Sequence, residues 1–122
     1  MRAAPPWSPL RRRERVPLTM SLDLAVLGND GTPVDVVPMR ASVHVRLMLV
    51  AERFRASLLL RMADFYRDAQ YGCAELPALD SEVEHVLRET PDDRELGQFL
   101  LQAKELLHRA CAQGAAVVAI AD

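Results

Sequence analysis

The first regular pattern in the chain is an alternation of apolar and polar residues at the period of a β-strand. Leu22, Leu24 and Val26 are apolar positions in this alternation, which is typical of a strand with one buried face. Residues 28–31, Gly-Asn-Asp-Gly, tolerate positive φ, and the alternation resumes after them. The pattern predicts a β-hairpin whose second strand ends at Pro38.

A helical pattern follows from Val43 to Ala69, a stretch without proline or glycine, and Ser42 before it is a suitable N-cap. Apolar residues recur there at three- and four-residue steps and would form one buried face. Further apolar positions make this stripe wider than an amphipathic helix needs. We therefore expect a helix that is covered on two sides or broken near Ala51–Glu52. The predicted buried face comprises Leu47, Ala51, Phe54, Leu58, Met62 and Phe65.

Two more helices are predicted from proline, threonine and glycine positions. Pro77 fits the first turn of a second helix that runs to about Glu89. The Thr90 hydroxyl is predicted to cap a third helix, with Pro91 in its first turn and Gly114 as its C-terminal cap. The expected buried stripes are Leu76, Leu79, Val83, Val86 and Leu87, then Leu96, Phe99, Leu100, Ala103, Leu106, Leu107 and Ala110.

The last predicted element is a strand over residues 115–121, a continuous run of small apolar side chains. The run is too short for another helix and rich in β-branched residues, so we expect a central strand that is buried on both faces and lies beside the first one. The resulting order is β-β-α-α-α-β. It predicts a two-layer α+β domain in which a three-stranded sheet, the N-terminal hairpin plus the C-terminal strand, packs on three helices.

Charge divides the chain at Met20. Residues 1–19 hold five arginines, one acid and four prolines, a composition that favours an extended, poorly ordered segment. Residues 20–122 hold ten basic and sixteen acidic side chains and all the predicted elements. We therefore expect a disordered basic tail over residues 1–19, Met20 as the native start, and a single α+β domain over residues 20–122.

Several classes of function are disfavoured by what the chain lacks. Cys73 and Cys111 are far apart and belong to no metal or redox motif, so we expect two free thiols and neither a metal nor a cofactor. Residues 1–19 contain no apolar run long enough for a secretory signal, and no segment of the chain is long and apolar enough for a membrane span. We therefore expect a cytoplasmic protein that does not bind membranes. Because the domain is acidic, nucleic acid is an unfavourable partner despite the basic tail.

Acid–base chemistry has one candidate pair of carboxylates. Asp64 and Asp68 are four residues apart and would share a helix face, where they could bind a divalent ion or divide acid and base roles. Neighbouring arginines favour surface ion pairs instead. The three histidines, His44, His85 and His108, have no nucleophile at a recognisable spacing, and we expect them to face solvent. The alternative function is therefore a small metal- or acid/base-dependent enzyme that uses Asp64, Asp68 and a histidine brought close by folding.

The domain is also electrically polarised. Residues 40–67 hold six arginines and two acids, whereas residues 68–122 hold eleven acids and four bases. Acidic residues on the second helix and its junction with the third would steer a basic protein partner to that surface, or would serve solubility alone. The predicted partner-binding residues are Asp80, Glu84, Glu89, Asp92, Asp93 and Glu95.

A set of mostly apolar packing positions runs through the middle of the chain. Its members are Phe54, Leu58, Leu59, residues 64–68, Glu75, Leu76, Leu79, Glu82 and Val83, followed by the closing strand at residues 118–122. These positions resemble small uncharacterised bacterial α+β proteins, some of which resemble immunity proteins of toxin systems. The resemblance covers residues 20–122 and carries over no functional residue.

Our leading hypothesis from the sequence is a non-enzymatic protein-binding module such as an immunity-type toxin inhibitor. The charge polarity and the lack of a recognisable catalytic, metal or nucleotide motif both point to a protein partner rather than to a substrate. The wide apolar face of the first helix, or the edges of the sheet, would equally support a homodimer.

Overall fold

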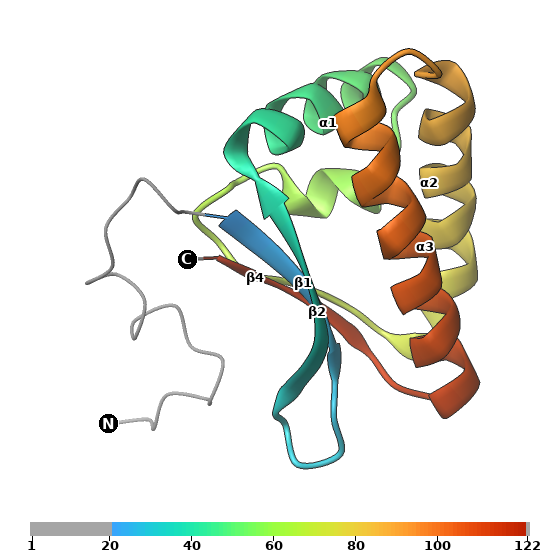
Figure 1. Cartoon of the computed structure of the whole chain (residues 1–122). Helices are drawn as coiled ribbons and strands as arrows, with labels where there is room; N and C mark the ends of the chain where they lie inside the picture. The colour runs from blue at the N-terminus through green and yellow to red at the C-terminus, as the bar shows by residue number, and fades with distance from the viewer. Residues whose placement is uncertain (1–20, 122) are drawn as a thin grey trace.

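A computed structural model describes residues 21–121 of the chain (Figure 1). Four strands form one antiparallel sheet in the order β2-β1-β4-β3, and three α-helices cover one face of it (Figure 1). The α+β class is confirmed. The predicted basic tail at residues 1–19, and Met20, lie outside the described residues. The elements are β1 (Ser21–Leu27), β2 (Pro33–Arg40), α1 (Ala41–Arg53), the 3-10 helix η3 (Leu59–Met62), β3 (Ala69–Tyr71), the 3-10 helix η4 (Cys73–Glu75), α2 (Leu76–Glu89), α3 (Arg94–Gln113) and β4 (Val117–Ala121).

The predicted hairpin is formed by β1 and β2, with its turn over residues 28–31. Gly31 has a φ of 81°, which a side chain would disfavour, and the Gly28 amide donates to the Thr32 carbonyl at 2.9 Å. The prediction that Pro38 ends the second strand is wrong, because β2 continues to Arg40. β2 lies at the edge of the sheet, where a proline is tolerated because the strand pairs on one side only.

The long helix predicted over residues 43–69 is wrong beyond Arg53. α1 has Arg40 rather than Ser42 at its N-cap position. It ends at Arg53, one residue after Glu52, which confirms the alternative of a break near Ala51–Glu52. Arg55 then takes a left-handed φ of 54°. The amide that follows, of Ala56, donates back to the Ala51 carbonyl at 2.9 Å. This is the geometry of a helix C-terminus, but with arginine where glycine is usual.

Residues 54–71 therefore form a turn, η3 and the short strand β3 instead of helix. β3 pairs with β4 through Ala69 opposite Ala119 and Tyr71 opposite Val117, so the sheet has a fourth strand and the three-stranded prediction is wrong. Tyr71 is fully buried, and its hydroxyl donates to the Leu58 carbonyl at 2.7 Å. Burial raises the pKa of Tyr71, which keeps this hydroxyl protonated as a donor.

α2 and α3 follow the predicted pattern except at their junction. Pro77 lies in the first turn of α2, and Gly114 ends α3 with a φ of 65°, as predicted. Thr90, however, ends α2 instead of starting α3, and its hydroxyl donates to the Val86 carbonyl at 2.8 Å. The N-cap of α3 is Asp93, whose carboxylate accepts from the Leu96 amide at 3.2 Å.

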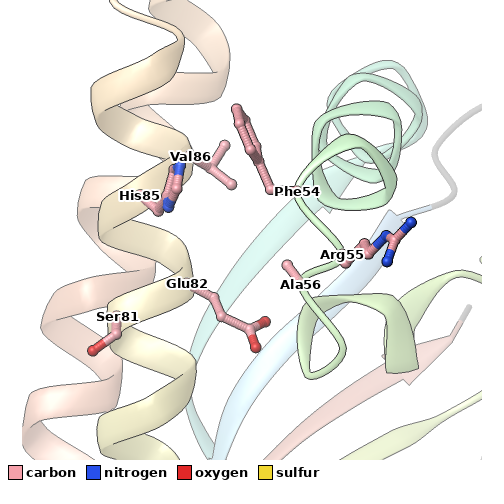
Figure 2. Close-up of a pocket in the computed structure, with 7 residues that line it drawn as sticks. All are labelled: Phe54, Arg55, Ala56, Ser81, Glu82, His85 and Val86. Atoms are coloured by element: carbon pink, nitrogen blue, oxygen red, sulfur yellow. The ribbon is translucent and has the colours of Figure 1, made fainter.

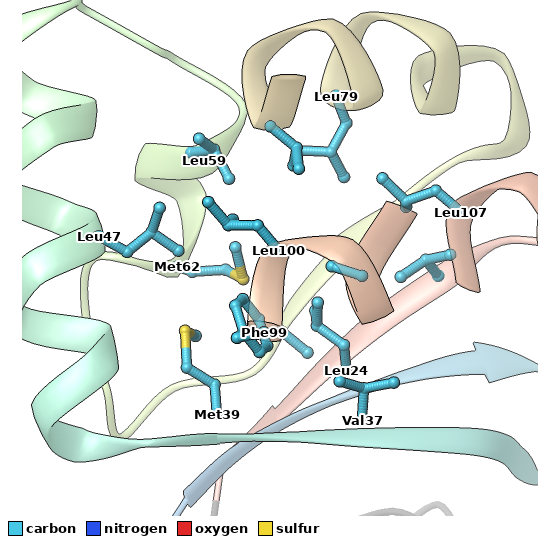
Figure 3. Packing of buried hydrophobic residues seen from close by; sticks show 14 of the residues in the cluster. Leu24, Val37, Met39, Leu47, Leu59, Met62, Leu79, Phe99, Leu100 and Leu107 are labelled. Carbon is cyan, nitrogen blue, oxygen red and sulfur yellow. The ribbon is translucent and has the colours of Figure 1, made fainter. Parts of the chain in front are cut away.

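The main core lies between the sheet and the helices (Figure 3). All five residues of β4 are buried, which confirms the prediction of a central strand whose side chains are buried on both faces. Ala25, Val118 and Ile120 form a second buried cluster, separate from the main one. Of the helices between residues 21 and 121, none has the length and apolar character needed to cross a membrane. Large, fully buried members of the main core include Leu22, Met39, Leu47, Leu59, Met62, Leu76, Leu96, Leu100, Leu106 and Leu107.

Candidate functional site

The six carboxylates predicted to bind a partner do not form one uniform acidic surface. Asp93 and Glu95, at the start of α3, both pair with Arg46 of α1. The Arg46 Nε atom lies 2.7 Å from Asp93 Oδ2, and Arg46 Nη2 lies 3.1 Å from Glu95 Oε1. The Arg46 hydrogen bond, followed by that of the Leu96 amide, lowers the pKa of Asp93. These two carboxylates therefore attach α3 to α1.

A second pair, Asp80 and Glu84 on α2, is held by Lys104 of α3. The Lys104 ammonium lies 3.0 Å from a carboxylate oxygen of each residue. Desolvation lowers the pKa of Lys104, but its hydrogen bonds to both carboxylates outweigh that effect and raise the pKa overall. His108 Nε2 lies 3.4 Å from Asp80 Oδ1. Asp80 and Glu84 are therefore also engaged in ion pairs within the protein.

Glu89 and Asp92 are the remaining two members of the predicted set. Both are exposed at the turn between α2 and α3. Within residues 21–121, neither carboxylate has an ion-pair partner within 4.0 Å. They are the carboxylates of the set that a partner could reach without competing with an existing ion pair.

Asp64 and Asp68 do not share a helix face, because the predicted helix does not extend to them. They nevertheless line one surface cavity of about 410 Å³, together with Arg61 and Arg67. Asp64 Oδ1 accepts from the Tyr66 amide at 2.9 Å, and Asp68 Oδ1 accepts from the amide of Ala121 at 2.8 Å. Both carboxylates therefore have roles in holding the backbone.

No histidine is among the residues that line the cavity at Asp64 and Asp68. His85 and His108 lie on α2 and α3 and are exposed, as predicted. His44 is buried, which corrects the expectation that it faces solvent. Its Nε2 atom lies 2.5 Å from the Met62 carbonyl. Among residues 21–121, no three His, Cys, Asp or Glu side chains are grouped closely enough to hold a metal ion.

Another surface cavity, of about 250 Å³, lies between α2 and the turn that follows α1 (Figure 2). The Phe54 and His85 rings line it with their centroids 4.4 Å apart and their planes tilted by 41°, while the Arg55 side chain points away from α2 (Figure 2). The Glu82 carboxylate accepts from the amides of Leu58 at 3.3 Å and Leu59 at 2.9 Å. Since Glu82 caps η3 from a different helix, this polar group has a structural role that local sequence spacing could not reveal.

No family model, curated protein or solved structure matches this chain.

The ion pair between Arg61 and Glu75 has a measurable consequence. Arg61 Nη1 lies 2.8 Å from Glu75 Oε1, and the same oxygen accepts from the Gly72 amide at 2.9 Å. The Arg61 hydrogen bond, followed by that of Gly72, lowers the pKa of Glu75 from 4.5 to about 2. The folded protein therefore favours the ionised carboxylate.

Glu75→Gln should consequently flatten the acid side of the stability profile. The lowered pKa stabilises the wild-type fold above pH 4.5, and this contribution is lost as the pH falls towards 2. We expect the variant to melt below wild type at pH 7 and to lose less stability between pH 5 and pH 2. Thermal unfolding followed by circular dichroism across that range measures this. Glu105→Gln, at an exposed glutamate of α3, is the matched control, and an equal change in its profile would contradict the assignment to Glu75.

Proposed function

We propose that this protein is a non-enzymatic binding module that holds a basic protein partner at the turn between α2 and α3, as an immunity-type inhibitor holds a toxin. The observation that carries the proposal is the exposure of Glu89, the last residue of α2, and of Asp92 in the turn that follows, neither of which has an ion-pair partner among residues 21–121. Exposed carboxylates attract a basic partner at long range and then pair with its lysines or arginines on contact.

The turn is held in place before any partner arrives. Thr90 bonds to the preceding turn of α2, and its carbonyl accepts from the Asp93 amide at 3.3 Å. Asp93 in turn caps α3 and pairs with Arg46 of α1. Because these contacts fix the backbone on both sides of Asp92, little conformational entropy is lost when a partner binds there. The ion pair between Asp93 and Arg46 therefore holds the turn in position, but these two residues are not part of the proposed binding surface.

Reversing the charge of Glu89 and Asp92 together should abolish capture of the partner. We expect the double variant Glu89→Arg, Asp92→Arg to capture about one tenth or less of the basic protein that wild type captures, because two attractive contacts become repulsive. The measurement is affinity capture from native lysate on the immobilised full chain, with quantitative mass spectrometry at low and high salt. Asp93 is left intact because its replacement would also disturb the cap of α3.

Glu105→Arg provides the matched control, because Glu105 is an exposed acid on another part of α3. It should retain the partner at the wild-type level. The proposal fails if no basic protein is captured. It also fails if the double reversal captures the same protein as well as wild type does, or if high salt does not weaken the capture.

A further inference from the structure

The face of the sheet that the helices do not cover carries a cluster of buried side chains. Ala25 of β1 is paired with Val118 of β4, and Ile120 lies two residues along β4, on the same side of the sheet. These three side chains form a cluster of their own, whereas Ala119 between the last two belongs to the main core under the helices. We call the group formed by Ala25, Val118 and Ile120 the outer cluster.

The outer cluster is buried more completely than an open sheet face permits. Ala25 and Val118 are 0% exposed, and Ile120 is 1% exposed. On a sheet face without a covering layer, β-branched side chains stand up from the pleat and keep contact with solvent. A covering layer must therefore lie over these three side chains.

Residues 21–121 do not supply that layer. α1, α2 and α3 all lie on the other side of the sheet (Figure 1), and η3 packs into the main core through Leu59 and Met62. Within this range, the outer cluster and the partly buried Leu27 that packs against it come from β1 and β4 alone. The covering layer therefore comes from outside residues 21–121.

The chain itself has one segment that is long enough to form the layer. The outer cluster is buried within a single copy of the chain, so a second copy or a partner protein is not what covers it. Outside residues 21–121, the chain has residues 1–20 and Asp122. A single aspartate is too small to cover three side chains on two strands, which leaves the segment before β1.

The length of residues 1–19 suits this role. The segment leads directly into β1 through Met20. An extended chain advances about 3.3 Å per residue, and neighbouring strands lie about 4.8 Å apart. Crossing β1 and β4 therefore needs only a few residues, and the four prolines of the segment favour such an extended course over a helix.

The composition of residues 1–19 also matches the outer cluster. Large apolar residues of the segment are Trp7, Leu10, Val16 and Leu18, and burying them against the outer cluster is favourable. Asp23, opposite Ile120 on the same face, is a carboxylate that is only 7% exposed. A buried carboxylate is stabilised by a nearby cation, and the segment carries five arginines against one acid.

We propose that residues 1–19 fold back over the outer face of the sheet and cover the outer cluster, with an arginine of the segment beside Asp23. The segment is then part of the fold, contrary to the sequence-based expectation of a poorly ordered tail. A protein that began at Met20 would expose the outer cluster to solvent. This goes beyond the proposed function, because it assigns a contact within the chain that does not involve the turn between α2 and α3.

A spin label in the segment tests the contact in the full chain. Ser8→Cys supplies the attachment site, in a background that carries Cys73→Ser and Cys111→Ser. We expect the label to broaden the methyl signals of the outer cluster in a ¹³C-methyl spectrum and to reduce their intensity. The matched control is a label at Ser81→Cys, an exposed position of α2 on the other side of the sheet, which should leave these signals sharp.

A second variant replaces residues 1–19 by a glycine–serine segment of equal length. This keeps the length of the chain but removes the apolar and basic side chains of the segment. We expect the fluorescent dye ANS to bind several-fold more to this variant than to wild type, because the outer cluster becomes exposed. The methyl signals of Ala25, Val118 and Ile120 should shift, and those of the main core should change little.

Three results would overturn the proposal. It fails if the label at residue 8 leaves the signals of the outer cluster unchanged. It also fails if broadening occurs only between a spin-labelled copy and a separate isotope-labelled copy, which would identify a second copy as the occupant. Finally, it fails if the glycine–serine variant folds and keeps the ANS binding and methyl shifts of wild type. If that variant does not fold, the spin-label experiment on the full chain decides alone.

Discussion

Leu100→Ala should destabilise the fold by about 3–4 kcal/mol. Leu100 is fully buried on α3, and Figure 3 shows it among Leu59, Met62 and Leu79. Truncation removes apolar contacts and leaves a cavity that these neighbours can fill only in part. Small domains have about 5–15 kcal/mol of total stability, so the expected loss is a large fraction of it.

The measurement is equilibrium unfolding in guanidinium chloride, where the midpoint should fall and the slope should remain unchanged. The next residue provides the control. Leu101 is 54% exposed, and Leu101→Ala should change the free energy of unfolding by no more than about 0.5 kcal/mol. Equal losses for the two variants would show that α3 does not bury the side assigned to it.

Glu82→Ala should cost about 2 kcal/mol, although the side chain is only half-buried. Its carboxylate accepts from the amides of Leu58 and Leu59 at the start of η3. Hydrogen bonds to a charged group contribute more than neutral ones, and alanine would leave both amides without this partner. The same unfolding titration measures the effect. Hydrogen exchange of the Leu59 amide should become faster as η3 opens.

Glu82→Gln separates the two contributions, because the amide keeps one acceptor oxygen and loses the charge. We expect about half the loss seen with alanine. Ser81→Ala, at the exposed neighbour on α2 whose hydroxyl bonds to the Pro77 carbonyl, is the surface control and should have little effect. If Glu82→Ala is no more destabilising than this control, the link between α2 and η3 is not significant for stability.

The region between α1 and α2 is where local sequence patterns failed to predict the secondary structure. Residues 43–69 have apolar positions at helical spacing and contain neither glycine nor proline, so local propensity favoured one long helix. The helix ends because Arg55 takes a left-handed conformation, at a cost of roughly 1–2 kcal/mol for a residue with a side chain. The Ala56 hydrogen bond and the packing of η3 on α2 offset this cost.

The α2–α3 junction gave a smaller error of the same kind. Thr90 and Asp93 are both good N-cap residues, and the threonine–proline pair favoured Thr90. In the fold, Asp93 is in reach of Arg46, which comes from a helix 47 residues earlier in the chain. The ion pair and the cap use the same carboxylate, so the start of α3 depends on where α1 lies.

The candidate surfaces differ in how far the sequence predicted them. Charge counting identified a basic first helix and an acidic second half. It could not show that Lys104 and Arg46 would occupy four of the six predicted carboxylates. The excess of apolar residues in the first helix was visible as well, but the sequence did not show that Val45 and Leu49 would remain exposed.

The sequence by itself determined the hairpin, α2, most of α3, the buried C-terminal strand and the α+β class. Each of these depends on local signals, namely a strand or helix period, a turn glycine or a helix-starting proline, which act within a few residues. The tertiary structure alone decided the end of α1, the strand β3, the cap of α3 and which charges remain free. Those features depend on contacts between residues distant in the chain, such as Tyr71 and Glu82 with Leu58. These contacts form only in the folded chain, where their free energy outweighs the local conformational preference of each segment.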